Sequence, residues 1–297
     1  MQNLSDLKIH FSPQSLTLLN IILAFIMFGI ALELRITDFT SLFKNKKSAI
    51  AGLTAHFILL PLLTFCLTIL LHPPPTVALG MILVGACPGG NMSNMFTHFA
   101  KGNTALAVAL TSVSHFLAII LTPLNFSFYG GLNPATATLL RTIHLSFLNV
   151  FQTILLVVGI PLLLGMLFRH FIPAVASHVT KWMKRLSLII FGGFIVAVFA
   201  GNAGVFLQSA AFILPLVVLH NALALGTGYT FASLLKLPLP DRRTITFETG
   251  VQNSGLGLLL IFTFFDGMSG MALVAATWGV WHLITGSVLA WLWGRNK

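Results

Sequence analysis

Long apolar segments alternate with short polar connections along the whole chain, and this alternation predicts its secondary structure. A helix needs roughly 20 apolar residues to cross a bilayer, and nine segments reach this length. They cover approximately residues 15–34, 48–71, 77–100, 104–128, 142–168, 186–207, 209–235, 244–265 and 270–293. Because no soluble segment interrupts the series, the pattern predicts an all-α polytopic membrane protein with nine transmembrane helices, in which residues 1–297 form one transmembrane domain.

Two of the nine segments contain a polar break. The third carries CPGGNMSN at residues 87–94, and the eighth carries ETGVQNSG at residues 248–255. Glycine and proline also serve as packing and kink residues in membrane helices. For either break taken alone, this structural role is the alternative to a functional one. The two breaks are five segments apart, however, so their helices cross the bilayer in opposite directions. This offset predicts inverted repeats with two discontinuous crossing helices.

Composition and charge agree with a membrane protein and predict its orientation. The 297 residues are 57% hydrophobic and 7% charged, with a net charge of +10. Of the 16 Lys and Arg residues, only Lys8 and Arg141 lie in one set of alternate connections. The other fourteen lie in the opposite set: Arg35, Lys44, Lys46, Lys47, Lys101, Arg169, Lys181, Lys184, Arg185, Lys236, Arg242, Arg243, Arg295 and Lys297. The positive-inside rule therefore predicts an N-terminus outside and a C-terminus in the cytoplasm, in a multi-pass protein of the cell inner (plasma) membrane.

The same distribution limits the expected partners. Since the basic residues follow membrane topology, we expect contact with membrane lipid headgroups and no nucleic acid. Cys66 and Cys87 lie inside different predicted helices, so a disulfide framework is not expected.

The two breaks also predict a binding site. Backbone groups released from a helix at membrane depth are costly unless protein, water or a ligand satisfies them. Each break begins a half-helix whose N-terminal amides carry partial positive charge, so two such ends near the midplane favour an anion. Further donors come from the side chains in the breaks: Asn91, Ser93, Asn94, Asn253 and Ser254.

Glu248 is an acidic residue in the interior of a predicted span, where a carboxylate costs roughly 2.5 kcal/mol or more unless it is paired or hydrated. The other spans offer no Lys or Arg partner, which leaves a bound cation or a proton. Hard cations such as Na⁺ prefer oxygen ligands. Candidate oxygens come from the side chains of Ser93, Asn94, Thr111 and Gln252 and from carbonyls around Thr249 and Val251. For Thr111, hydrogen bonding to its own helix is the stronger alternative.

The chain resembles the bile acid/sodium symporter family, and in particular its bacterial members. The matching stretches are IMFGIALEL followed by DF (26–39), ILVGACPGGNMSN (82–94), KGNTALAVALTSVS (101–114), VVLHN (217–221), ETGVQNSGL (248–256) and VWHLITGS (280–287). The resemblance implies a core domain of approximately residues 48–128 and 209–293 and a panel domain of approximately residues 15–34 and 142–207. It also implies alternating access. Bacterial relatives usually have ten spans, and the nine spans predicted here resemble theirs with the first span missing.

By position, the resemblance implies two sites for Na⁺ as the coupling ion and one for substrate. The first sodium site would use Ser93, Asn94, Thr111 and Glu248, and the second Glu248, Thr249, Val251 and Gln252. The substrate would contact Asn91, Asn253, Ser254 and His282. Two positions depart from the family pattern: Ala107 replaces a hydroxyl residue of the first site, and His56 replaces a glutamine of the second.

His56 leaves two alternatives. It could weaken or alter sodium coupling, contributing a protonatable charge near Glu248, because an imidazole is a poorer ligand for Na⁺ than a carbonyl oxygen. Alternatively, it is displaced or only donates a hydrogen bond, and Na⁺ binds through the remaining ligands.

These features predict a secondary active transporter rather than an enzyme. The expected substrate is a small organic anion, a carboxylate, carried by sodium-coupled symport. Proton-coupled or sodium-independent transport of the same substrate class is the first alternative. An ion channel is an alternative from another class. An intramembrane hydrolase using Ser93 or Ser254 is disfavoured, since no GxSxG motif is present.

Overall fold

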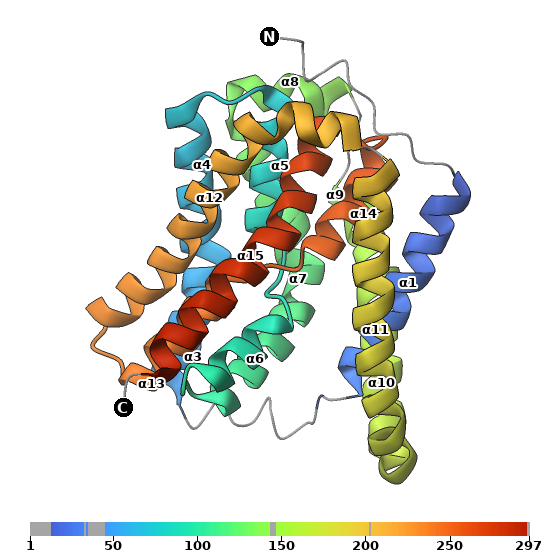
Figure 1. The fold of residues 1–297 in the computed structure, drawn as a ribbon, viewed down its shortest axis with the longest axis vertical. Helices are drawn as coiled ribbons and strands as arrows, with labels where there is room; N and C mark the ends of the chain where they lie inside the picture. The colour runs from blue at the N-terminus through green and yellow to red at the C-terminus, as the bar shows by residue number, and fades with distance from the viewer. Residues whose placement is uncertain (1–12, 33, 35–44, 143–146, 202, 296–297) are drawn as a thin grey trace.

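The computed structural model describes residues 13–32, 34, 45–142, 147–201 and 203–295, and within these ranges it contains helices and no strand (Figure 1). The α-helices are α1 (Pro13–Ala31), α3 (Lys46–Thr54), α4 (Leu60–Leu71), α5 (Pro75–Ala86), α6 (Met92–Phe99), α7 (Thr104–Leu132), α8 (Pro134–Thr142), α9 (Phe147–Ile154), α10 (Ile160–Phe171), α11 (Pro173–Gly201), α12 (Ala203–Leu234), α13 (Leu239–Gly250), α14 (Ser254–Phe264) and α15 (Ser269–Arg295). Two π-helical turns, η1 (Ala55–Leu59) and η2 (Leu155–Gly159), join α3 to α4 and α9 to α10.

Five of the described helical stretches are long and apolar enough to cross a membrane: Lys46–Leu71, Thr104–Leu132, Phe147–Phe171, Phe206–Leu234 and Ser269–Arg295. Shorter apolar helices cover Asn20–Ala31, Pro75–Ala86 and Ser254–Phe264. The predicted all-helical membrane class is thus confirmed. The number of spans stays a prediction.

One helix begins well before its predicted span. The span expected to begin near residue 186 is part of α11, which already begins at Pro173. The basic segment before residue 186 therefore continues the helix instead of forming a separate connection. A search for apolar residues cannot detect this extension, because hydropathy changes along α11 while its helical structure does not.

The π-helical turn η1 depends on a proline and an asparagine. Pro61 lacks a backbone N–H, so it cannot donate to the carbonyl of Phe57 four residues earlier. The side chain of Asn125 in α7 donates to that carbonyl instead, at 2.9 Å. This replacement satisfies a backbone acceptor that would otherwise be unpaired inside an apolar environment.

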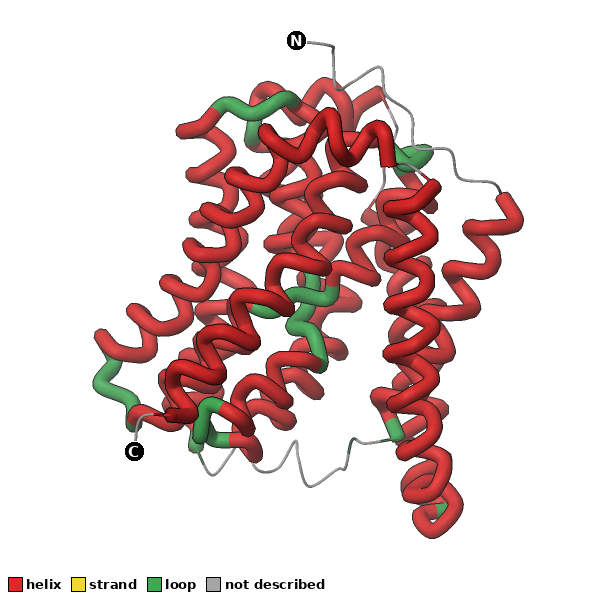
Figure 2. Tube along the Cα trace, viewed as in Figure 1, coloured by secondary structure: helices red, strands yellow, loops and turns green. Residues whose placement is uncertain are grey.

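The two predicted breaks are confirmed and meet near the middle of the molecule. The loops between α5 and α6 and between α13 and α14 lie there among the helices, as Figure 2 shows. Gly89 and Gln252 form an antiparallel bridge. The Gly90 amide donates to the Val251 carbonyl at 2.7 Å, and the Asn253 amide donates to the Pro88 carbonyl at 2.8 Å. We call these two paired segments, residues 87–91 and 251–253, the crossing.

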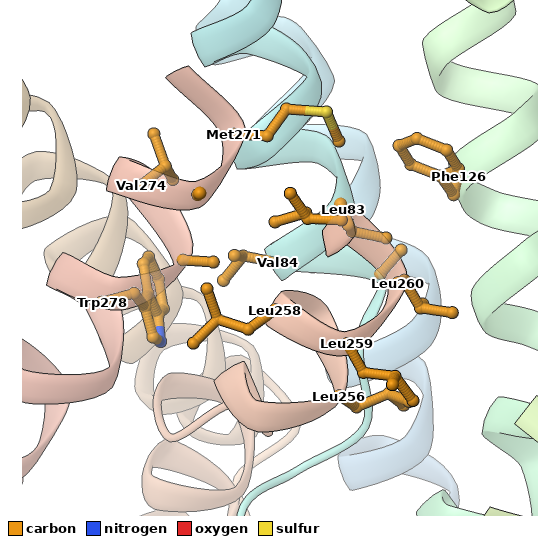
Figure 3. Packing of buried hydrophobic residues seen from close by; sticks show 14 of the residues in the cluster. Leu83, Val84, Phe126, Leu256, Leu258, Leu259, Leu260, Met271, Val274 and Trp278 are labelled. Carbon is orange, nitrogen blue, oxygen red and sulfur yellow. The ribbon is translucent and has the colours of Figure 1, made fainter. Parts of the chain in front are cut away.

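An apolar layer lies on one side of the crossing, formed mainly by α5, α14 and α15 (Figure 3). Leu83, Leu258 and Trp278 are each no more than 1% exposed. Gly80 lets α5 approach α15 closely, because a Cβ at this position would lie 2.8 Å from the Met271 Cα. Small residues allow such close approach between membrane helices. The half of each broken helix on this side is therefore tightly packed.

On the other side of the crossing, α6 is less enclosed than the other half-helices. There α6 packs against α7, α13 and α15. Its side chains alternate between buried and exposed, with Met95 41% and Phe99 58% exposed. By contrast, the described residues of α14 from Ser254 to Phe262 are all buried. Since α13 is also mostly buried, α6 is the half-helix with the greatest access to the surroundings.

Candidate functional site

The Glu248 carboxylate lies at the centre of the candidate site. It is only 1% exposed, near the C-terminal end of α13 and beside the crossing. Its Oε2 accepts hydrogen bonds from the hydroxyls of Thr111 at 2.7 Å and Ser93 at 3.0 Å. Its Oε1 accepts one from the Ser114 hydroxyl at 3.2 Å. Three hydroxyls from α6 and α7 therefore surround a buried carboxylate on α13.

Asn94 joins this group through Thr111, whose hydroxyl lies 3.1 Å from the Asn94 Oδ1. The Ser93 and Thr111 hydroxyls are 3.3 Å apart. Thr111 thus directs its hydroxyl at Asn94 and Glu248, and the alternative of bonding to its own helix does not describe this position. The structure brings together all four residues predicted for the first sodium site. We call Ser93, Asn94, Thr111, Ser114 and Glu248 the oxygen cluster.

Glycine at position 89 permits the carboxylate to lie against the crossing. A Cβ built on Gly89 would lie 2.9 Å from the Glu248 Cδ, and nearer still to Oε1. Real Cβ atoms do not approach other atoms so closely, so any other side chain would displace the carboxylate. Gly89 is consequently a packing requirement of the site as well as part of a helix break.

His56, in the π-helical turn η1, contacts both broken helices. Its Nδ1 lies 3.0 Å from the Glu248 carbonyl oxygen, and its Nε2 lies 3.0 Å from the Cys87 carbonyl oxygen. A neutral imidazole carries one N–H, so it donates to one of these acceptors at a time. The side chain is 1% exposed. The side chain thus hydrogen-bonds to the breaks and is not displaced from them, and its effect on sodium coupling stays a prediction.

The residues predicted for the second sodium site use their oxygens largely within the protein. The Thr249 hydroxyl donates to the Ile245 carbonyl at 2.8 Å, and the Gln252 amide donates to the Thr249 carbonyl at 2.7 Å. The Val251 carbonyl accepts from Gly90 in the crossing. The Gln252 Oε1 is buried without a hydrogen-bond partner. The structure thus places these residues beside Glu248, with the Gln252 amide oxygen left unpaired.

The four predicted substrate residues lie around the crossing but are not joined to one another by any hydrogen bond recorded for the described residues. Asn91 is exposed, and Asn253 is half-buried and caps α14 by accepting from the Leu256 amide at 3.1 Å. Ser254 and His282 are buried, and the His282 Nδ1 has no hydrogen-bond partner. His282 lies on α15, which packs against both α6 and α14.

Sequence reasoning missed Ser114. The segment TSVS (111–114) places it three residues after Thr111, and positions three residues apart share one face of a helix. This spacing was the available signal. It had little weight because serine in a membrane helix often bonds to its own backbone, and Ser114 does also donate to the Thr111 carbonyl at 2.9 Å.

The oxygen cluster fits a hard monovalent or divalent cation. Its members present carboxylate, hydroxyl and amide oxygens, and the recorded partners of the Glu248 carboxylate are neutral hydroxyls. Soft metals prefer thiolate or imidazole ligands. Among the described residues, no group of three or more His, Cys, Asp or Glu side chains could hold a metal ion, so a transition-metal centre is not indicated there.

The chain is similar in sequence to known proteins. The family model described as the sodium bile acid symporter family matches residues 20–209. An uncharacterized sodium-dependent transporter of Bacillus subtilis, YocS, is 36% identical over 278 residues, which cover 94% of this chain and 83% of YocS.

Two further relatives come from eukaryotes. The probable sodium/metabolite cotransporter BASS1 of Arabidopsis thaliana chloroplasts is 33% identical over 91% of this chain and 65% of its own length. The human ileal sodium/bile acid cotransporter is 28% identical over 81% of this chain and 67% of its own length. The chain thus spans about two thirds of the length of these two proteins.

Proposed function

This chain belongs to the sodium bile acid symporter family, and we propose that it carries a small organic anion across a membrane together with Na⁺. The single observation that carries the proposal is the Glu248 carboxylate. It is buried, it is surrounded by oxygen atoms, and its recorded partners are the hydroxyls of Ser93, Thr111 and Ser114. A charge in this setting is costly unless a counter-ion accompanies it. A transported cation supplies that counter-ion.

In this proposal the oxygen cluster holds the first Na⁺. Thr249, Val251 and Gln252 contribute to a second cation position, where the unpaired Gln252 Oε1 is the available side-chain oxygen. Na⁺ bound at either position neutralises the carboxylate. The names of YocS, BASS1 and the ileal cotransporter all include sodium, which supports the same ion here.

The proposed substrate is a small carboxylate that binds at the crossing. The N-terminal ends of α6 and α14 both begin there, and helix N-termini favour anions. Asn91, Asn253, Ser254 and His282 supply further donors around the same point. A cation bound beside Glu248 would add positive charge close to the substrate, so binding of one ligand favours binding of the other.

We also propose the architecture that this mechanism needs. The chain has nine spans, with a core of approximately residues 48–128 and 209–293 that moves against a panel of approximately residues 15–34 and 142–207. The N-terminus is outside and the C-terminus cytoplasmic, in the cell inner membrane. In support, the starts of α3 and α13 and the end of α15 lie at the same end of the molecule in Figure 1 and carry Lys46, Arg242 and Arg295, whereas α8 lies at the opposite end.

The proposal predicts that Na⁺ stabilises the purified protein. A ligand that binds only the folded state raises stability, by about 2.7 kcal/mol at a concentration 100 times its Kd. We therefore expect a higher melting temperature in NaCl than in matched KCl or choline chloride. In proteoliposomes we expect saturable counterflow of labelled carboxylates that requires Na⁺. Equal melting temperatures in all three salts would contradict sodium coupling, and single-channel currents would indicate a channel.

We propose that His56 weakens the second cation position, because its ring offers nitrogen instead of an amide oxygen and is held at the crossing by the carbonyls of Cys87 and Glu248. The His56→Gln variant offers an amide oxygen in place of the ring, so its sodium concentration for half-maximal uptake should fall severalfold. His220→Gln is the matched control, because His220 is also a buried histidine but contacts Thr64 instead of the crossing. Identical sodium titrations for wild type and His56→Gln would remove this role for His56.

A further inference from the structure

Ser114 and Ala107 occupy positions on the same helix, on either side of Thr111. Ala107 is buried and contributes a methyl group, so it offers no oxygen. Ser114 is also buried, and its hydroxyl reaches the Glu248 Oε1 at 3.2 Å. Positions three or four residues apart lie on one helix face. The helix face that carries Thr111 therefore has a side-chain oxygen one turn after Thr111 and none one turn before it.

We propose that the Ser114 hydroxyl is a ligand of the coupling cation, so that the cation position in this chain is displaced along α7 toward Ser114. This inference rests on the proposed function, since it assumes that a cation binds beside Glu248. It adds a residue to that site and concerns cation affinity and selectivity.

The hydrogen bonds of Ser114 permit this role. A hydroxyl has one proton and two lone pairs, and Ser114 can give its proton to the Thr111 carbonyl, 2.9 Å away. With the proton directed at that carbonyl, a lone pair is free to face a cation held by the Glu248 Oε1. No proton has to leave the site, and no charged group has to be added.

Ser114 also serves the carboxylate oxygen that the other hydroxyls do not contact. Ser93 and Thr111 both bond to Oε2, whereas Ser114 bonds to Oε1. A cation held by both carboxylate oxygens would therefore have hydroxyl ligands on one side from Ser93 and Thr111 and on the other from Ser114. Without Ser114, Oε1 would keep no side-chain hydroxyl among the recorded contacts.

Ser112 provides a matched control on the same helix. This serine is also buried, but its hydroxyl donates to the Val108 carbonyl at 2.6 Å. Among the described residues it forms no hydrogen bond with Glu248. Ser112→Ala and Ser114→Ala therefore remove the same atom from the same helix, and they differ in the contact with the carboxylate.

The experiment is a sodium titration of the melting temperature of full-length protein, in wild type, Ser112→Ala, Ser114→Ala and the double variant Ala107→Ser/Ser114→Ala. Choline chloride keeps the ionic strength constant. We expect Ser114→Ala to raise the half-saturating Na⁺ concentration about tenfold, because the cation loses one of its ligands. Ser112→Ala should leave this concentration unchanged. The double variant should recover part of the affinity, because Ala107→Ser restores an oxygen on the same face.

Each outcome decides the inference. A Ser114→Ala titration equal to that of wild type overturns it, as does an equal loss in Ser112→Ala. If wild type shows no response to Na⁺, the proposed sodium coupling fails, and this inference fails with it. Should Ser114→Ala not fold, Ser114→Cys keeps the volume but offers a sulfur that is a poor ligand for Na⁺, and an unchanged half-saturating concentration in that variant overturns the inference.

Discussion

Replacing Glu248 with glutamine is expected to abolish the stabilisation by Na⁺ and to reduce sodium-driven uptake to background. Glutamine keeps nearly the same volume and still accepts a hydrogen bond, but it carries no charge. Since the carboxylate is the charged member of the oxygen cluster, a cation bound there would lose its counter-charge at a buried position. The measurement is the melting temperature in NaCl against choline chloride, followed by uptake in proteoliposomes.

The control for this variant is Asp241→Asn, which changes a second buried carboxylate of α13. Asp241 accepts hydrogen bonds from the side chains of Asn45, Ser48 and Asn103, at 2.8, 2.6 and 2.8 Å. It links the N-terminal ends of α3 and α7 to α13 and takes no part in the oxygen cluster. Asp241→Asn should therefore lower the melting temperature in both salts and preserve the shift caused by Na⁺. If Na⁺ still raised the melting temperature of the Glu248→Gln protein, this result would contradict a cation site at the oxygen cluster.

Substituting alanine for Gly89 should have a comparably large effect on transport. The added methyl group would overlap the Glu248 carboxylate, so either the carboxylate leaves the oxygen cluster or the two loops of the crossing separate. We expect uptake at subsaturating Na⁺ to fall by about tenfold or more, equivalent to about 1.4 kcal/mol of lost binding. Uptake against sodium concentration is the measurement.

Gly226→Ala serves as the reference for that substitution. Gly226 lies in α12, and a Cβ there would meet nothing within 4 Å. This variant should transport at the rate of wild type. Wild-type uptake by Gly89→Ala would show that the crossing accommodates a side chain and that the close approach to Glu248 has no functional importance.

The breaks, Glu248 and its polar neighbours Ser93 and Asn94 can be predicted because they depend on residue type. The residues alone favour bonding of Thr111 to its own helix, and the family resemblance assigns it to the site. A glycine-rich polar stretch inside an apolar segment, and an acid with no basic partner, are exceptions to the composition of a membrane helix. Such exceptions are visible without coordinates. The pairing of Gly89 with Gln252 then follows from the meeting of two breaks at one depth.

The remaining features depend on side-chain direction, which residue type does not determine. The positions of both His56 ring nitrogens rest on a π-helical turn. That turn rests on Pro61 and on the side chain of Asn125, which lies 68 residues along the chain from its acceptor Phe57. Ser114 could equally have bonded only to its own helix. The start of α11 cannot be read from the predicted span, because hydropathy marks where a helix enters lipid and not where its hydrogen bonding begins.

The crossing is joined by main-chain atoms, through the amides of Gly90 and Asn253 and the carbonyls of Val251 and Pro88. The junction therefore makes few demands on the side chain of Asn91, which is exposed, whereas the Asn253 side chain also caps α14. The Asn91 side chain can therefore be exchanged without loss of the junction, whereas Gly89 cannot. In the proposed mechanism, exchanging Asn91 would alter the preference for substrate while the oxygen cluster stays constant.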